Sequence, residues 1–216
     1  MIRFQTFCSR CNTIPNKTIH SSGLHGDKIM LQDIINKNTH ESEIQKYLQE
    51  NSEILINSFG NPEIVVYPKF KLGSEYECDF ILYNWCSSVC SKTTVVELKL
   101  PRAKLLTKSN IPTKDLSLAL SQVNKYMNWI HKNQIYFHNQ LYNISKPITV
   151  FDRIREFINH KPNYINSVII IGQRAQFSEE ENLYRSNIYQ TTHGGIEIVS
   201  YDRLIESENK MQKFNQ

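Results

Sequence analysis

The feature that most constrains this chain is an apolar run, Thr93–Leu100, that carries two charged residues, Glu97 and Lys99. Its β-branched residues favour extended backbone. A strand this apolar is typical of one buried on both faces, at the centre of a sheet. Pro101 follows at once and predicts the end of the strand. The rest of the chain is therefore expected to build a sheet around this segment.

Other elements are predicted on both sides of the central strand. Alternating or apolar runs predict further strands at 64–67 and 69–72 (separated by Pro68), 77–83, 166–172 and 196–201. Helical spacing predicts a helix capped by Thr39, a second over 116–130, and shorter ones at 151–158 and 202–206. This order predicts an α/β fold, a sheet with helices packed on it.

A length of 216 residues suits one domain. We expect an irregular N-terminal arm over residues 1–37, which lack an apolar period, the folded domain over 38–206, and a polar, flexible tail over 207–216. The net charge of +4 is compatible with a polyanionic partner without demanding one.

The cysteine content and the apolar runs indicate a compartment. The chain has five cysteines, an odd number, and its N-terminus lacks the apolar run of a signal peptide. Reduced thiols and a cytoplasmic location are therefore expected. The longest apolar runs are far shorter than a bilayer-spanning helix, so no membrane association is expected.

Asp79, Glu97 and Lys99 form the candidate catalytic set. Residues two apart in a strand share a face, so Glu97 and Lys99 point the same way, and Asp79 lies on the preceding predicted strand. Two carboxylates suit Mg²⁺, which acidifies bound water and offsets phosphate charge. A lysine beside them can orient or deprotonate that water. The alternative is an ordinary ion pair on a solvated face, with Asp79 an edge acid.

Gln122 and Tyr126 lie four residues apart on the 116–130 helix, and therefore on one face of it. An amide and a phenol above a metal site can bind a phosphate or a metal-bound water. In the alternative interpretation, Tyr126 belongs to the core and Gln122 to the surface.

These residues resemble the PD-(D/E)XK nucleases, including the variant with Gln-xxx-Tyr on the following helix. A wider ordered set is similar to the nuclease domain of the Shedu anti-phage defence proteins. Its segments are 41–51, 67–76, 78–80, 96–101, 122–126, 169–174 and 198–204.

The resemblance implies an α/β, restriction-endonuclease-like fold with a mixed central sheet flanked by helices. It also implies Mg²⁺-dependent DNA cleavage (with Mn²⁺ as a substitute), a homo-oligomer and a role against phage. It implies Asp79 and Glu97 as metal ligands, Lys99 as the catalytic lysine and Gln122 as an auxiliary residue. An acid on the first helix is also implied: Glu41 fits the spacing best, and Glu43 is the alternative. A DNA-binding or assembly module that no longer cleaves is the rival interpretation.

Two further groups have open interpretations. Cys8, Cys11, His20 and His25 have the residue types of a small zinc site, which would make the arm an interaction module, or they belong to an irregular arm. Six basic residues either contact DNA phosphates or form a solvated surface: Arg102, Lys104, Lys108, Lys125, Arg174 and Arg185.

Overall fold

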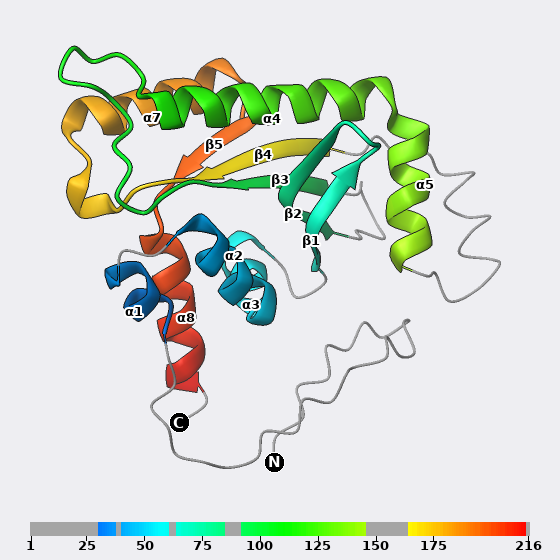
Figure 1. The fold of residues 1–216 in the computed structure, drawn as a ribbon, viewed down its shortest axis with the longest axis horizontal. Helices are drawn as coiled ribbons and strands as arrows, with labels where there is room; N and C mark the ends of the chain where they lie inside the picture. Colours follow the sequence, from blue (N-terminus) through cyan, green and yellow to red (C-terminus); the bar gives the residue numbers. More distant parts are fainter. Residues whose placement is uncertain (1–29, 38–39, 61–63, 85–91, 146–163, 215–216) are drawn as a thin grey trace.

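The computed structural model describes residues 30–37, 40–60, 64–84, 92–145 and 164–214 (Figure 1). Two sequence predictions fall outside these ranges. They are the candidate zinc residues of the arm and the helix expected at 151–158.

The centre of the fold is a five-stranded sheet of order β1-β2-β3-β4-β5. Its strands are β1 (Ile64–Leu72), β2 (Tyr76–Asn84), β3 (Lys92–Leu98), β4 (Tyr164–Ile170) and β5 (Ile196–Val199). The first three run antiparallel to one another, whereas β3, β4 and β5 are parallel. β3 is thus central, as its apolar sequence predicts, and its side chains from Thr93 to Leu98 are all buried.

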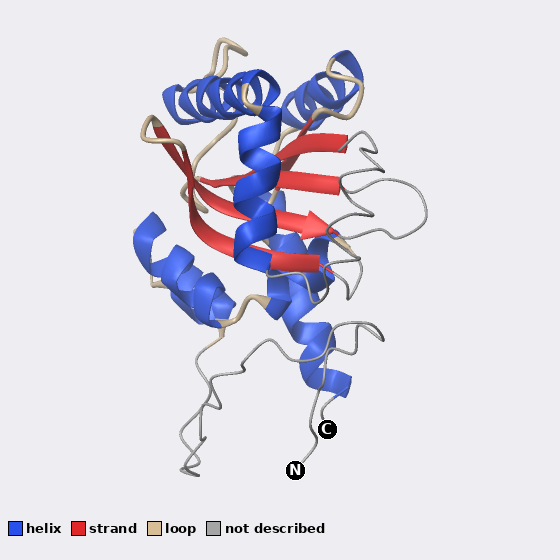
Figure 2. Ribbon diagram, turned by 90° about the vertical axis from the view of Figure 1, so that its right-hand side faces the viewer, coloured by secondary structure: helices blue, strands red, loops and turns tan. Residues whose placement is uncertain are grey.

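Helices cover both faces of the sheet, so the predicted mixed sheet flanked by helices is confirmed (Figures 1 and 2). One face packs against α4 (Lys114–Lys132), α5 (Gln134–Ser145) and α7 (Glu179–Thr191). The other packs against α1 (Leu31–Asn36), α2 (Glu41–Glu50), α3 (Glu53–Phe59) and α8 (Asp202–Phe214). β3 contributes side chains to the hydrophobic cores on both faces of the sheet: Val95 to the first, and Val96 and Leu98 to the second.

The long helix α4 confirms the prediction made from its apolar spacing. Thr113 caps it, and the Thr113 side chain accepts a hydrogen bond from the amide of Leu116. Leu116, Ala119, Val123 and Tyr126 lie on its buried face. A single amphipathic stripe therefore holds the helix over the sheet.

The predictions about the ends of the chain and the first strand are wrong in part. The arm expected over 1–37 includes helix α1, and the helix expected to end at Glu206 continues to Phe214. The tail expected from 207 is helical because α8 buries Glu208, which accepts the amide hydrogen of Leu31 at 2.9 Å. β1 continues through Pro68, which is tolerated because β1 is an edge strand.

Smaller differences affect other elements. The N-cap of α2 is His40 rather than Thr39. Helices α3, α5 and α7 are additional to the predicted order. β3 ends at Leu98, although the amide of Lys99 still donates to the carbonyl of Ile170 at 2.8 Å. Within the described ranges, no helix combines the length and hydropathy needed to cross a bilayer.

Candidate active site

The site begins where β2 and β3 separate. Their paired register runs from Asn84 opposite Lys92 to Phe80 opposite Val96. Beyond that pair, Oδ2 of Asp79 accepts the amide hydrogen of Leu98 at 2.8 Å. A side-chain carboxylate thus takes the place of a strand–strand hydrogen bond, and it holds Asp79 next to the segment that carries Glu97.

Glu97 and Lys99 form a buried ion pair next to Asp79. Nζ of Lys99 lies 2.8 Å from Oε1 of Glu97, with side-chain exposures of 12% and 5%. The alternative of a solvated Glu-x-Lys pair is therefore wrong. Glu97 lies with Val95 on the face of β3 that is covered by α4, and the Tyr126 hydroxyl on that helix lowers the pKa of the Glu97 carboxyl.

The environment of Glu97 and Asp79 disfavours the ionised forms of their carboxyl groups. Burial raises the pKa of Glu97 to about 7, and the charge of Asp79 adds to the rise, whereas Lys99 and Tyr126 oppose it. Burial also raises the pKa of Asp79, opposed by the Leu98 amide, Lys69 and Lys99. The local charge balance therefore favours any cation that can approach both carboxylates.

Lys99 is held as an ammonium ion. Burial lowers its pKa, but the hydrogen bond and charge of Glu97 outweigh burial and raise the pKa above its usual value. Its backbone is also fixed, because the hydroxyl of the fully buried Tyr201 donates to the Lys99 carbonyl at 2.8 Å. An ammonium ion can donate hydrogen bonds but cannot accept a proton, so the Glu97–Lys99 pair as it stands does not favour proton abstraction by Lys99.

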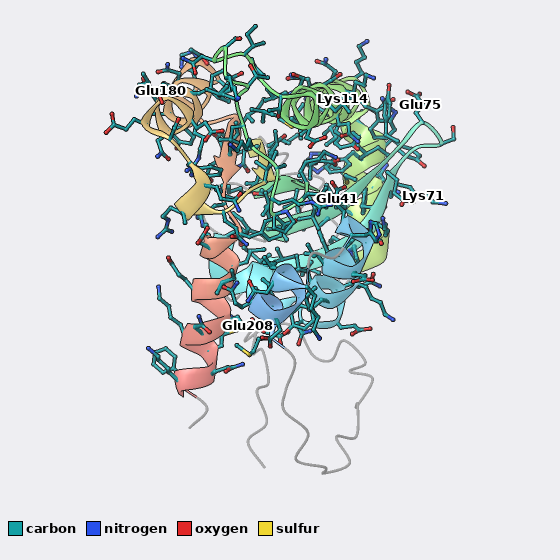
Figure 3. All side chains as sticks on the ribbon, turned by 60° about the vertical axis from the view of Figure 1, so that its left-hand side comes forward. Glu41, Lys71, Glu75, Lys114, Glu180 and Glu208 are labelled. Carbon is teal, nitrogen blue, oxygen red and sulfur yellow. The ribbon has the colours of Figure 1, made fainter. Side chains whose placement is uncertain are left out.

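Glu41 approaches the same group from the first turn of α2. Burial raises its pKa, the charge of Lys99 lowers it, and the charge of Asp79 raises it further. Figure 3 shows Glu41 between α2 and the strands. Glu43 is exposed. The geometry therefore places Glu41, rather than Glu43, beside the buried carboxylates.

Gln122 is half-buried on α4, one turn before Tyr126. For Tyr126 the structure agrees with the alternative interpretation, a residue of the core. It is 4% exposed within the core, and its hydroxyl donates to the carbonyl of Glu77 at 3.1 Å. In the described part of the chain, no hydrogen bond or ion pair connects Gln122 to the carboxylates, so its auxiliary role stays a prediction.

A comparison with protein-family models shows to which family the chain belongs. A family model described as "Shedu protein SduA, C-terminal" matches residues 38–205. The chain belongs to the Shedu family. The matched range contains Glu41, Asp79, Glu97, Lys99 and Gln122. A search of the curated proteins found no match.

The donor set of this Shedu chain fits a hard divalent cation. Among the described residues, no three His, Cys, Asp or Glu side chains are grouped to hold a metal. Two carboxylates remain, and the charge of Asp79 raises the pKa of Glu97. A dication between them would offset that repulsion, with water or phosphate oxygens completing its coordination, as Mg²⁺ prefers.

Three residues that contact the Shedu site were not predicted from the sequence. Tyr201 fixes the Lys99 carbonyl, the amide of Gln45 donates to the Asp79 carbonyl at 3.5 Å, and Nζ of Lys69 lies 3.9 Å from Oδ1 of Asp79. Of the three, only Gln45 could have been suspected from the sequence, because it directly follows Ile44 and therefore lies close to the apolar stripe of α2.

The predicted phosphate-binding residues divide into two groups. Arg174 pairs with Glu206 at 2.9 Å, and Arg185 donates to the Ile198 carbonyl at 2.9 Å, so both already have partners within the fold. The other four are exposed, which is compatible with either interpretation: Arg102, Lys104, Lys108 and Lys125.

Proposed function

We propose that this protein is a metal-dependent DNA endonuclease of the PD-(D/E)XK type that acts in anti-phage defence. The observation that carries the proposal is the meeting of Asp79, Glu97 and Lys99 where β2 and β3 separate. The mixed sheet with helices on both faces supports the restriction-endonuclease-like fold. Membership of the Shedu family supports the defence role.

Each residue has a task in this proposal. Oδ1 of Asp79 and the Glu97 carboxylate would hold Mg²⁺, or Mn²⁺ in its place. The bound ion would acidify a water and offset charge on the scissile phosphate. Lys99 orients the attacking water and compensates the charge of Glu97, to which it is already bonded at 2.8 Å. Tyr201 keeps Lys99 in place, and Gln122 would assist at the phosphate.

Glu41 contributes a third carboxylate from the helix side. Its pKa responds to both Lys99 and Asp79, so its charge acts on the same reacting region. The proposal further includes a homo-oligomer in the cytoplasm with DNA as the partner, as the family resemblance implies. The exposed residues Lys104 and Lys108, which follow the active strand, would contact the DNA backbone.

A cleavage assay tests the proposal. The full chain is incubated with linear and supercoiled DNA in Mg²⁺, in Mn²⁺ and in EDTA. Cleavage is expected only with the metals, and Glu97→Ala and Lys99→Ala should abolish it while circular dichroism stays unchanged. Glu75→Ala, which removes an exposed acid at the β1–β2 turn, is the matched control and should cut normally.

Unchanged cleavage by either site variant would overturn the catalytic assignment. EDTA-insensitive DNA binding without products under any divalent metal would instead support the rival, a Shedu module that binds DNA or assembles without cutting.

A further inference from the structure

Lys69 has an unusual backbone for a residue inside a strand. Its φ is +49°, in the left-handed region, although it lies within β1. Two other described non-glycine residues, Asn110 and His193, also have positive φ, but both lie outside the strands. Lysine has no short polar side chain to stabilise this conformation locally, so surrounding structure must impose it.

The unusual conformation changes which way the strand residues face. On β1, the side chains of Tyr67, Phe70 and Leu72 all face the core under α4. Side chains of a regular strand alternate between its two faces, so the step of three residues from Tyr67 to Phe70 means that the alternation is interrupted around Lys69. On β2, Cys78 and Ile81 both face that core, so the alternation also skips around Asp79. The two irregularities lie at matching positions, because Pro68 pairs with Phe80 and Phe70 with Cys78.

The matched irregularities bring Lys69 to the oxygen of Asp79 that Leu98 does not use. Nζ of Lys69 lies 3.9 Å from Oδ1 of Asp79 and 3.9 Å from Oε1 of Glu77, whereas Oδ2 accepts the Leu98 amide. The Lys69 side chain is 53% exposed, in contrast to 12% for Lys99. A long, half-exposed ion pair is weak, so little energy holds Lys69 in this place.

We propose that Lys69 is a second lysine of the active site, which exchanges partners during substrate binding. Without a cation it partly neutralises Oδ1 of Asp79. When a divalent cation takes that oxygen, the ammonium is repelled and binds a phosphate of the DNA backbone beside the scissile bond. This inference rests on the proposed nuclease function and adds a substrate-binding residue to it.

Electrostatics explains why the exchange is favourable. Asp79 and Glu97 are each approached by one lysine, Lys69 and Lys99, so without metal the two lysines already offset most of the negative charge of the group. A dication adds charge that only an anion can offset. The phosphate of the substrate is that anion, and an exposed ammonium close to the metal-binding oxygen can reach it.

Two affinities measured on the same variant test the exchange. Lys69→Met removes the charge but keeps much of the side-chain length, and Lys71→Met is the matched control, an exposed lysine on the same strand (Figure 3). Calorimetry of Mn²⁺ binding without DNA should show tighter binding by Lys69→Met, by about twofold to fivefold, the worth of an exposed ion pair. Lys71→Met should bind Mn²⁺ as the unmodified chain does.

DNA binding gives the second affinity, measured by anisotropy in Mg²⁺ on a Lys99→Ala background to prevent cleavage. Adding Lys69→Met should weaken binding and reduce the slope of log K against log salt by about 0.9, the loss of one phosphate contact. Lys69→Arg should keep the slope, and Lys71→Met should not change it.

Opposite changes of the two affinities would support the exchange, because a purely structural role would lower both. A Lys69→Met protein that loses affinity for both ligands, or a Lys71→Met protein that behaves like it, would overturn the inference. If the unmodified chain cuts DNA but Lys69→Met changes neither affinity, only this inference fails. If the unmodified chain neither binds Mn²⁺ nor cuts DNA, the proposed function fails with it.

Discussion

Glu97 should make the stability of the metal-free protein decrease with rising pH. Its native pKa is about 7, against an ordinary value of 4.5. Between these values the native protein holds a proton that the unfolded chain releases, so the free energy of unfolding falls as pH rises. The difference corresponds to about 3.4 kcal/mol in full, of which about 2.5 kcal/mol is lost between pH 5 and pH 8.

The substitution Glu97→Gln removes this dependence. It also leaves Lys99 without its partner, but the charges of Glu41 and Asp79 still raise the pKa of Lys99, so that cost should be nearly the same at both pH values. Asp79 and Glu41 also have raised pKa values, and they remain in both proteins. The difference in slope between the two proteins therefore reports Glu97 itself.

Urea denaturation followed by circular dichroism measures the effect, in EDTA because a bound metal would ionise Glu97. From pH 5 to pH 8, the unmodified protein should lose about 2.5 kcal/mol more than Glu97→Gln does. Glu75→Gln, an exposed control, should follow the unmodified protein. Parallel curves for Glu97→Gln and the unmodified protein, or a larger loss in Glu97→Gln, would show that burial does not raise the pKa of Glu97.

Three further outcomes are expected. Glu41→Ala should reduce DNA cleavage while Glu43→Ala, which removes an exposed acid, should not; equal effects in a cleavage assay would contradict the placement of Glu41. Glu181→Gln should lower the free energy of unfolding by about 1–3 kcal/mol, because the buried carboxylate accepts three amide hydrogens and an amide group cannot accept them all; Glu180→Gln is the exposed control in urea denaturation. Tyr201→Phe should reduce the rate of cleavage with little change in DNA affinity, and a change in affinity alone would argue against its link to the active-strand lysine.

The central strand and the catalytic pair were predictable because they depend on local pattern. An apolar run with two charges two residues apart specifies a buried strand with both charges on one face. The structure agrees for β3, with Glu97 and Lys99 bonded on that face. The helix α4 was predictable for the same reason, since its apolar stripe is continuous.

The details that complete the site depend on contacts between distant segments. The separation of β2 from β3 at Asp79 is a property of two strands together, and no residue at that point is a glycine or proline. The left-handed backbone of Lys69 is equally invisible in the sequence, because lysine rarely adopts it.

The C-terminal helix α8 shows a different difficulty. Its last residues are polar, yet Glu208 is buried and bonds to Leu31, 177 positions earlier. A polar pattern alone cannot distinguish this packed helix from a solvated tail. By contrast, the start of α7 carries a pattern that can be recognised in a sequence, the capping box of Ser178 and Glu181.

Anomalous diffraction from crystals of the full chain soaked in Mn²⁺ tests the central claim most directly. We expect an anomalous peak within coordination distance of Oδ1 of Asp79 and the carboxylate of Glu97, with no peak there in Glu97→Ala crystals. Mn²⁺ bound elsewhere while both carboxylates remain paired only with Lys69 and Lys99 would contradict it.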